Sequence, residues 1–156
     1  MNIDEQMERI YRDIPPEKIP WNMPHPPDLL VEAVKQGKIK PCRMIDLGCG
    51  AGNYSVWFAQ QGFDVTGVDI SKNAIALATG LAASKGAKCK FIATDLLGDL
   101  SEFHSSFDFA FDWEVLHHIA PENRSRYLEN VHGLLRSDGI YFSLCFSDKD
   151  IDFSGG

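Results

Sequence analysis

The sequence has few cysteines, and their spacing is not typical of a metal site or a disulfide framework. Its 156 residues include four cysteines, at positions 42, 49, 89 and 145, and none of them forms a Cys-x-x-Cys pair. No cysteine and histidine group has the spacing of a zinc finger. Free cysteine commonly behaves as a small buried hydrophobic residue. We therefore expect no bound metal and a reducing, cytoplasmic location.

Long apolar runs and an excess of positive charge are also missing. No run reaches the length that spans a membrane, and the polar, acidic start MNIDEQMERI is unlike a secretory signal. The chain has 15 Lys and Arg against 22 Asp and Glu, which gives a net charge of −7. Nucleic-acid binding depends on clustered Lys and Arg. These features argue against a membrane and against nucleic acid as the main partner, and they do not predict an oligomeric state.

Proline is scarce outside one segment near the N-terminus. Six of the eight prolines fall within residues 10–27, so this stretch is not expected to form a long helix or a central strand. The same stretch carries Trp21 and other apolar side chains. We predict that residues 1–26 form an arm or lid that packs on a domain comprising residues 27–156.

After residue 27, apolar runs alternate with helical patterns. We expect strands over 42–48, 63–70, 88–96, 107–113 and 139–146. Helices are expected over 27–37, 53–62, 71–86 and 121–139, with Ser71 as the N-cap of the third. Strands that alternate with helices of this length form βαβ units with right-handed crossovers and a parallel sheet. The pattern predicts an α/β, doubly wound fold.

The stretch MIDLGCGAGNYS, residues 44–55, places three glycines directly after the first expected strand. Gly48, Gly50 and Gly52 allow a sharp turn, and they lack the Cβ atoms that would keep a ligand away from the backbone. Asp46 precedes the turn, where its carboxylate can order the loop or attract a cationic group. Alone, such a loop is more often a tight turn without a ligand.

Two further acids change this interpretation. Asp69 ends the second expected strand and Asp95 the third, and in a parallel sheet these ends meet at one edge. A carboxylate in the position of Asp69 can accept hydrogen bonds from both hydroxyls of a ribose. Each acid can also serve as a helix cap or turn residue. Together with the glycine loop, they favour a nucleoside site.

The glycine spacing indicates which nucleoside is bound. The loop has the pattern G-x-G-x-G, whereas a dinucleotide site has G-x-G-x-x-G. Asp46 would also repel a pyrophosphate. A ligand with a ribose, no phosphate and a positive charge fits better, and S-adenosylmethionine (SAM) has these properties.

These stretches resemble class I SAM-dependent methyltransferases. DLGCGAG at 46–52 is similar to their first motif, VTGVDIS at 65–71 to their second-strand acid, and ATDLL at 93–97 to their adenine-side acid. The arm IPWNMPHPP, the FDFAFDW…HHI stretch and CFSDKD resemble the thiopurine, thiol/halide and tellurite-resistance subgroup. The resemblance implies a Rossmann-like, mainly parallel sheet of strand order 3-2-1-4-5, with helices on both faces.

The resemblance also implies a role for particular residues. Asp69 would bind the ribose hydroxyls, and Ile70 would lie against the adenine. Asp95, next to Leu96, would accept a hydrogen bond from the adenine amino group. The other residues expected to bind SAM lie along its methionine portion or in the arm that closes over it: Trp21, Asp46, Gly48, Cys49, Gly50, Asn53 and Asp112.

The C-terminus departs from the family pattern. Such enzymes follow the fifth strand with a helix and an antiparallel hairpin, and we expect this hairpin to be missing here, either because the chain is truncated or because a partner supplies the edge. The acceptor is expected to be a small molecule, with a thiol or another soft nucleophile favoured. A non-catalytic SAM-binding module, an inactive fragment and an NAD-dependent oxidoreductase domain are the alternatives.

Four side chains are candidates for a general base that an amine or hydroxyl acceptor would need: Asp112, Glu114, His117 and His118. Neighbouring residues on a helix point about 100° apart, so the two histidines do not readily serve one centre. A structural role is therefore favoured for both, and no catalytic residue is assigned.

Overall fold

The computed structural model describes residues 2–145, and its centre is a sheet of five strands. All four strand pairings are parallel, in the order β3-β2-β1-β4-β5. The strands are β1 (Arg43–Leu47), β2 (Asp64–Asp69), β3 (Cys89–Ala93), β4 (Phe107–Trp113) and β5 (Leu135–Leu144). The α-helices are α1 (Ile3–Asp13), α2 (Asp28–Lys35), α3 (Asn53–Gln60), α4 (Lys72–Lys85) and α5 (Arg124–Leu134). Short 3-10 helices are η1 (Pro16–Lys18), η2 (Ser101–Phe103), η3 (Leu116–His118) and η4 (Pro121–Asn123).

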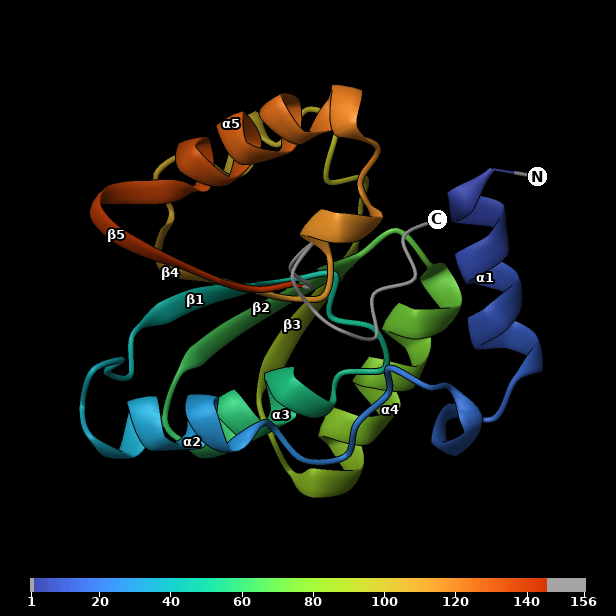
Figure 1. Ribbon diagram of the computed structural model, residues 1–156. Coiled ribbons are helices and arrows are strands. Elements are labelled where there is room, and N and C mark those ends of the chain that lie inside the picture. The colour runs from blue at the N-terminus through green and yellow to red at the C-terminus, as the bar shows by residue number, and fades with distance from the viewer. Residues whose placement is uncertain (1, 146–156) are drawn as a thin grey trace, which may run out of the picture.

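Helices cover both faces of the sheet, so the predicted doubly wound fold and strand order are confirmed. In Figure 1, α5 lies on one face and α2, α3 and α4 lie on the other. The aromatic side chain of Phe58 from α3 packs with Phe109 and Phe111 of β4. On the opposite face, Tyr127 and Val131 of α5 are buried in a second core cluster. The order reverses between β1 and β4, where a doubly wound sheet binds ligands.

The structure confirms the predicted N-cap of α4. The hydroxyl oxygen of Ser71 accepts a hydrogen bond from the Ala74 backbone N–H at 3.0 Å. The helix ends at Gly86, which adopts a left-handed conformation with a φ of 63°. These are the usual signals for starting and ending a helix, and they fix α4 directly behind the end of β2.

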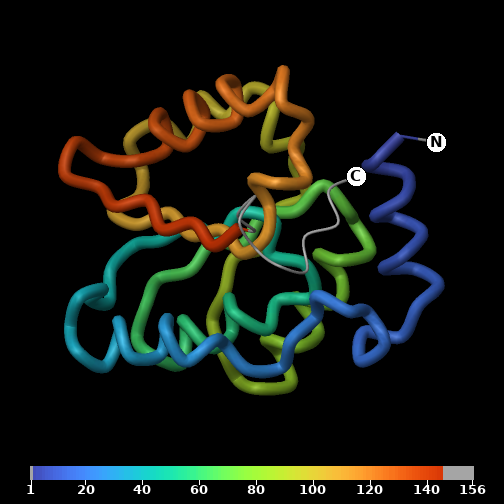
Figure 2. Tube along the Cα trace, in the orientation of Figure 1, coloured from blue at the N-terminus to red at the C-terminus, as the bar shows by residue number. Residues whose placement is uncertain are grey.

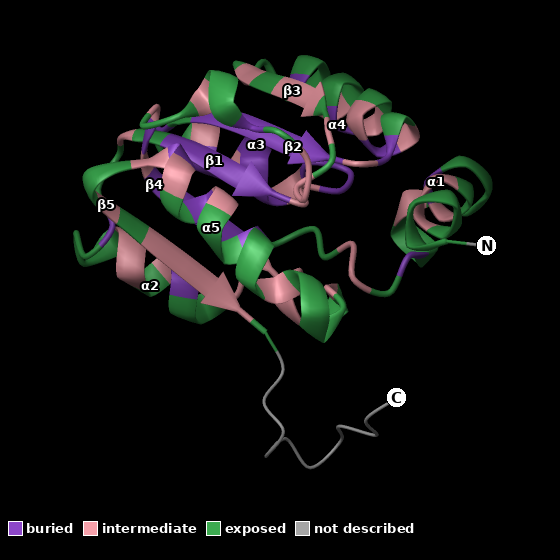
Figure 3. Ribbon diagram, turned by 90° about the horizontal axis from the view of Figure 1, so that it is seen from above, coloured by how far each residue is buried: buried purple, intermediate pink, exposed green. Residues whose placement is uncertain are grey.

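The N-terminal segment contains a helix that the sequence analysis did not predict. Its prolines begin only at Pro15, so the preceding residues are free to form α1. Ile3, Met7 and Tyr11 recur at the four-residue spacing of a helix face. This helix stands beside the carboxyl ends of the central strands (Figure 3). Figure 2 follows the chain from α1 on one side of the molecule to α2 on the other.

The boundary between α5 and β5 also differs from the prediction. The helix was expected to run from 121 to 139, but it ends at Leu134, and β5 begins at Leu135. Leu135 pairs with Phe107, and the register then shifts before Phe109 pairs with Ile140. Because this first pairing is irregular, the start of β5 is not evident from the sequence pattern. Phe146 and the C-terminal ending lie outside the described residues.

Three negative results apply to residues 2–145. No helix there has the length and apolar composition needed to cross a membrane. The sheet over these residues has no antiparallel strand, and β5 is its edge beside β4. Within the same part of the chain, no group of three or more His, Cys, Asp and Glu side chains is placed to hold a metal ion.

Candidate functional site

The glycine loop after β1 is tightly packed against other parts of the protein. Gly48, Gly50 and Gly52 have φ values of 68°, 55° and 89°, a conformation that disfavours other residues. A Cβ atom added to them would approach, at 2.6–2.7 Å, Val115 Cγ2 for Gly48, Tyr11 Oη for Gly50 and Ala78 Cβ for Gly52. The absence of side chains is thus required by the fold itself, including by α1.

Backbone hydrogen bonds attach this loop to the end of β2. The Cys49 N–H donates to the carbonyl of Val68 at 2.9 Å. The Gly50 N–H donates to Asp69 Oδ2 at 2.9 Å, and the Ser71 N–H donates to Asp69 Oδ1 at 2.9 Å. Burial raises the pKa of Asp69, and the two backbone amides oppose that shift. Asp69 therefore orders the loop, while each of its oxygens keeps a further lone pair for a ligand.

Asp46 is buried beneath the loop. Its Oδ2 accepts a hydrogen bond from the Ser55 hydroxyl at 2.6 Å, which ties β1 to α3. The pKa of Asp46 is raised to about 7, mainly by burial; the bond from Ser55 opposes this rise, and the charges of Asp69 and Asp112 add to it. Both predicted actions of this acid are thus available: it orders the loop region, and it faces a cavity in which a cation would favour its ionised form.

Asp95 lies two residues beyond β3, in an exposed turn. Its Oδ1 accepts a hydrogen bond from the Leu97 N–H at 2.9 Å. The preceding Thr94 N–H donates to the carbonyl of Asp69 at 2.9 Å, so the turn is joined to the end of β2. The structure therefore brings Asp69 and Asp95 to one edge of the sheet, as predicted.

Two adjoining cavities open at this edge. The larger has a volume of about 550 Å³ and the smaller about 50 Å³. Both are lined by Tyr11, Trp21, Gly48 and Trp113. Of the predicted SAM-binding residues, the larger cavity also has Asp69, Ile70, Asp95 and Leu96. The smaller also has Asp46, Cys49, Gly50 and Asn53. Burial raises the pKa of the Cys49 thiol, which keeps it protonated.

Asp112 is the one predicted SAM-binding residue that lines neither cavity. It is fully buried, and three hydroxyl groups donate hydrogen bonds to its carboxylate. Tyr127 Oη donates at 2.8 Å, Ser143 Oγ donates at 2.7 Å, and Tyr141 is the third donor. Its contact with the methionine portion of SAM stays a prediction, and the structure gives this acid a different set of partners.

The N-terminal arm forms one wall of the site. Trp21 Nε1 donates to Tyr11 Oη at 2.8 Å, and Asn53 Nδ2 donates to Asn22 Oδ1 at 2.9 Å. Ile3 and Met7 of α1 line the larger cavity together with Tyr11. The sequence analysis missed these three side chains, although their four-residue spacing was a usable signal.

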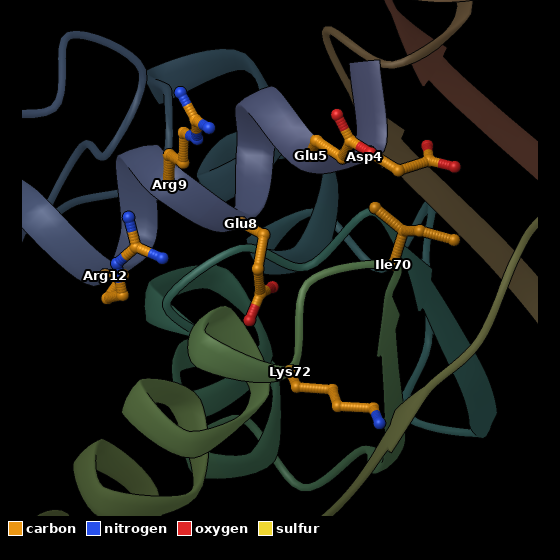
Figure 4. Close-up of a pocket in the computed structure, with 7 residues that line it drawn as sticks. All are labelled: Asp4, Glu5, Glu8, Arg9, Arg12, Ile70 and Lys72. Atoms are coloured by element: carbon orange, nitrogen blue, oxygen red, sulfur yellow. The ribbon is translucent and has the colours of Figure 1, made fainter. Parts of the chain in front are cut away.

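A charged hollow of about 410 Å³ lies between α1 and the start of α4, next to Ile70 (Figure 4). There Glu8 points from α1 toward the first turn of α4, while Lys72 extends away from α1. Glu8 Oε1 accepts from the backbone N–H of Asn73 at 3.2 Å and from its side-chain amide. This contact fixes α1 to the start of α4, where a carboxylate also complements the helix dipole.

The far side of the larger cavity carries three of the four candidate bases. Glu114, His117 and His118 all line it, and Glu114 has a φ of 59°, which is unusual for a residue other than glycine. Burial raises the pKa of Glu114 and lowers the pKa of both histidines. Their rings are in contact, with centroids 4.2 Å apart. A neutral histidine can accept a proton, so this wall can serve acid–base chemistry.

The family of the chain follows from a comparison with known proteins. The family described as "Methyltransferase domain" matches residues 44–139, which is more than half of the chain. The chain belongs to this methyltransferase family. That result confirms the family predicted from the glycine loop and the strand-end acids, and it rejects the alternative of an NAD-dependent oxidoreductase.

Individual relatives of this methyltransferase domain act on different molecules. A 2-heptyl-1-hydroxyquinolin-4(1H)-one methyltransferase of Mycobacteroides abscessus is 26% identical over 93% of this chain and 65% of the relative. A structure concerning the conversion of a disulfide bond into a thioacetal group during echinomycin biosynthesis has a TM-score of 0.86 and 29% identity. It covers 94% of this chain and 62% of that one.

A third relative was solved with ligands bound. The 1,6-didemethyltoxoflavin-N1-methyltransferase of Burkholderia thailandensis, with 1,6-didemethyltoxoflavin and S-adenosylhomocysteine (SAH), has a TM-score of 0.72 and 27% identity. The match covers 90% of this chain and 59% of that one. The methyltransferase domain described here thus spans about three fifths to two thirds of the length of these relatives.

Proposed function

We propose that this chain binds SAM at the carboxyl edge of its sheet and transfers the methyl group to a small-molecule acceptor. The observation that carries the proposal is that the two cavities adjoin, with Tyr11, Trp21, Gly48 and Trp113 lining both. One is lined by the acids Asp69 and Asp95, and the other by Asp46 and the glycine loop. A nucleoside fits the cavity with Asp69 and Asp95, and a cationic, phosphate-free substituent on it fits the cavity with Asp46.

The charges of the cavity walls support SAM over a dinucleotide. Among the described residues that line the two cavities, Arg124 is the only lysine or arginine. Its Nε donates to the carbonyl of Ile119 at 3.0 Å, which ties this side chain at the start of α5 to the loop after η3. A pyrophosphate would instead lie among carboxylates, without the cations that commonly neutralise it. The sulfonium and ammonium groups of SAM are favoured by the same carboxylates.

Each acid has a distinct task in this proposal. Asp69 accepts from the ribose hydroxyls with the lone pairs that its two backbone donors leave free. Asp95 accepts from the adenine amino group through the oxygen that is not bonded to Leu97. Asp46 faces the amino-acid end of the ligand, and an ammonium group there lowers its raised pKa and stabilises its carboxylate.

SAM, when bound, supplies an electrophilic methyl group on a positively charged sulfur. The chain's task is then alignment, since well-oriented reactions gain about 7–11 kcal/mol from positioning. Tyr11 and Trp21 border both cavities and are hydrogen-bonded to each other, so they exclude water from the junction where the methyl group would lie. Glu114 and His118 stand on the acceptor side of the larger cavity and can take up a proton.

A thiol or another soft nucleophile is the acceptor class that we propose. Apolar side chains surround the acceptor side, including Met7, Trp113 and Val115. A soft, polarisable nucleophile needs little beyond alignment, and the weakly basic histidines suffice to remove its proton. The echinomycin relative also concerns sulfur chemistry.

Calorimetric titration tests the cofactor proposal, with SAM, SAH and NAD as ligands. We expect SAM and SAH to bind and NAD to give no response. Asp95→Asn is expected to weaken SAH binding about tenfold, because a ligand donor loses a charged acceptor. Asp99→Asn is the matched control, since Asp99 is also exposed and accepts the same kind of turn bond, from the Ser101 N–H at 2.9 Å. Binding of NAD but not SAM by folded protein would refute the proposal.

A further inference from the structure

The turn that carries Asp95 has few attachments to the sheet. Thr94 bonds to the end of β2, and the Gly98 N–H closes the turn onto the carbonyl of Asp95 at 3.0 Å. Asp95 itself is exposed, and its carboxylate accepts from the Leu97 N–H. The direction of this carboxylate therefore depends on how the backbone of residues 96–98 is held.

Side chains from α5 hold that backbone. The amide of Asn130 donates both of its hydrogens, to the carbonyl of Leu96 at 2.8 Å and to the carbonyl of Gly98 at 3.1 Å. Arg126 lies one helical turn earlier, and its Nε donates to the carbonyl of Leu97 at 2.5 Å. Three consecutive carbonyls thus point toward one face of α5.

The geometry of the turn connects these bonds to Asp95. The carbonyls of residues 96–98 all accept hydrogen bonds from α5. The peptide group between Leu96 and Leu97 therefore has its carbonyl directed toward the helix and its N–H directed away from it. The N–H of Leu97 is then presented to Asp95 Oδ1. Neither Asn130 nor Arg126 lines the larger cavity, so neither contacts a ligand there. Their influence on the ligand passes through the turn.

We infer that Asn130 is a positioning residue for the recognition of the adenine base, acting through the turn that carries Asp95. This inference rests on the proposed function, in which Asp95 accepts from the adenine amino group. Arg126 adds the third bond from the exposed side of the helix. α5, which lies on the opposite face of the sheet from α3 and α4, thereby contributes to cofactor selectivity.

The test is a double-mutant cycle between Asn130→Ala and Asp95→Asn, read out with two ligands. SAH carries the 6-amino group on its base, and S-inosylhomocysteine carries an oxo group in its place. We expect the wild-type chain to prefer SAH. Asn130→Ala should reduce this preference about three- to tenfold, because the hydrogen bond between Asp95 and the adenine amino group would lose its good geometry. Glu129→Ala, an exposed neighbour on α5, is the control and should leave the preference unchanged.

The cycle separates positioning from a purely structural role. In the Asp95→Asn background, Asn130→Ala should change SAH affinity by less than about twofold, because coupled residues are not additive. Equal losses for both ligands, or additive losses in the cycle, would overturn the inference. An unchanged ligand preference in Asp95→Asn would contradict the proposed contact between Asp95 and the adenine amino group, and the inference with it. If Asn130→Ala does not fold, Arg126→Ala removes the bond to Leu97 from an exposed position and completes the same cycle.

Failure of the proposed function gives a different result. A folded wild-type chain that binds neither SAH nor its inosine analogue would contradict the cofactor site itself. A wild-type chain that binds SAH selectively but shows an additive cycle would contradict only the role of Asn130.

Discussion

Asp69 and Asp112 occupy similar places in the fold but have different environments. Each lies at the carboxyl end of a strand that pairs with β1, and each is buried. Asp69 accepts from two backbone amides and lines the larger cavity. Asp112 accepts from three hydroxyl groups and lines neither cavity. Of these two strand-end acids, only Asp69 therefore faces the cavity in which a ligand would lie.

The origin of the partners explains the difference. The amides that bond Asp69 belong to the glycine loop and to the start of α4, which follow directly from the βαβ pattern. The hydroxyls that bond Asp112 come from α5 and β5, on the other half of the sheet. The first half thus orders a binding site, and the second uses its acid to join three elements of the core.

The largest effect on stability is expected for Asp112→Ala. Removing this carboxylate leaves three hydroxyl groups without their acceptor in the interior, which we expect to lower the free energy of unfolding by about 3–5 kcal/mol. Urea unfolding measures it. Asp108→Ala on the same strand is the control, since the Asp108 side chain is 41% exposed and its ion pair with Arg136 lies at the surface, so the change should alter stability by less than about 1 kcal/mol. An Asp112→Ala chain as stable as the wild type would contradict the assigned partners.

Gly52→Ala tests the packing of the glycine loop. The added Cβ would lie 2.7 Å from Ala78 Cβ and 2.9 Å from its Cα, at a φ of 89°. We expect a loss of about 3 kcal/mol, from strain plus overpacking. Gly86→Ala is the matched control, because Gly86 has a φ of 63° but no atom within 4 Å of the added carbon. It should lose only about 1 kcal/mol in thermal or urea unfolding, and equal losses would show that packing is unimportant here.

The raised pKa of Asp46 predicts a pH dependence of stability. Its pKa rises from an ordinary value of 3.8 to about 7 in the folded chain, so the folded state binds the proton more tightly. The contribution of Asp46 to stability is then full below pH 3.8 and is lost as the pH rises to about 7. Between pH 5 and 7 we expect a fall of about 2 kcal/mol.

To check this dependence, the free energy of unfolding is measured from pH 4 to 8 for the wild type and for Asp46→Asn, and the two pH profiles are compared. The asparagine keeps an acceptor for the Ser55 hydroxyl and does not titrate. The fall in the free energy of unfolding with pH should be smaller in Asp46→Asn. It should be unchanged in Asp64→Asn, the control at an exposed position at the start of β2. A slope that survives in Asp46→Asn would assign the pH dependence to another group.

The smallest effect is expected for Tyr11→Phe in the N-terminal arm. The change removes the acceptor of the Trp21 indole N–H but keeps the edge-to-face contact of the rings, whose centroids are 6.5 Å apart. We expect the free energy of local opening of the arm to fall by about 1 kcal/mol. Hydrogen exchange should become faster in α1 and stay unchanged in β1 and β4. Uniformly faster exchange would instead indicate a loss of global stability.

Much of the fold is predictable from local patterns in the sequence. The alternation of apolar runs and helices predicts the parallel sheet, and Ser71 predicts the start of α4. The end of α5 is less predictable, because Leu135 begins a strand whose first pairing is irregular. The helix α1 was missed because the prolines after residue 14 dominated the interpretation of the whole segment, although Ile3, Met7 and Tyr11 show a helical period.

The site is predictable to the extent that its residues lie at strand ends. Asp69 and Asp95 were located because a parallel sheet brings such ends to one edge. The partners of Asp112 were not, since Tyr127 and Tyr141 reach it only through the packing of α5 and β5. Likewise, no local signal indicates that Gly50 must accommodate the hydroxyl of Tyr11.

The most direct test compares Asp69→Asn with Asp112→Asn, each measured for SAH binding by calorimetry and for unfolding by urea. We predict that Asp69→Asn loses SAH affinity at least about tenfold, with a stability loss near 1 kcal/mol, because one backbone N–H then faces an amide donor. Asp112→Asn should lose about 2 kcal/mol of stability and keep its SAH affinity within about twofold. A folded Asp112→Asn chain that loses SAH binding as strongly as Asp69→Asn would contradict the division between the two acids.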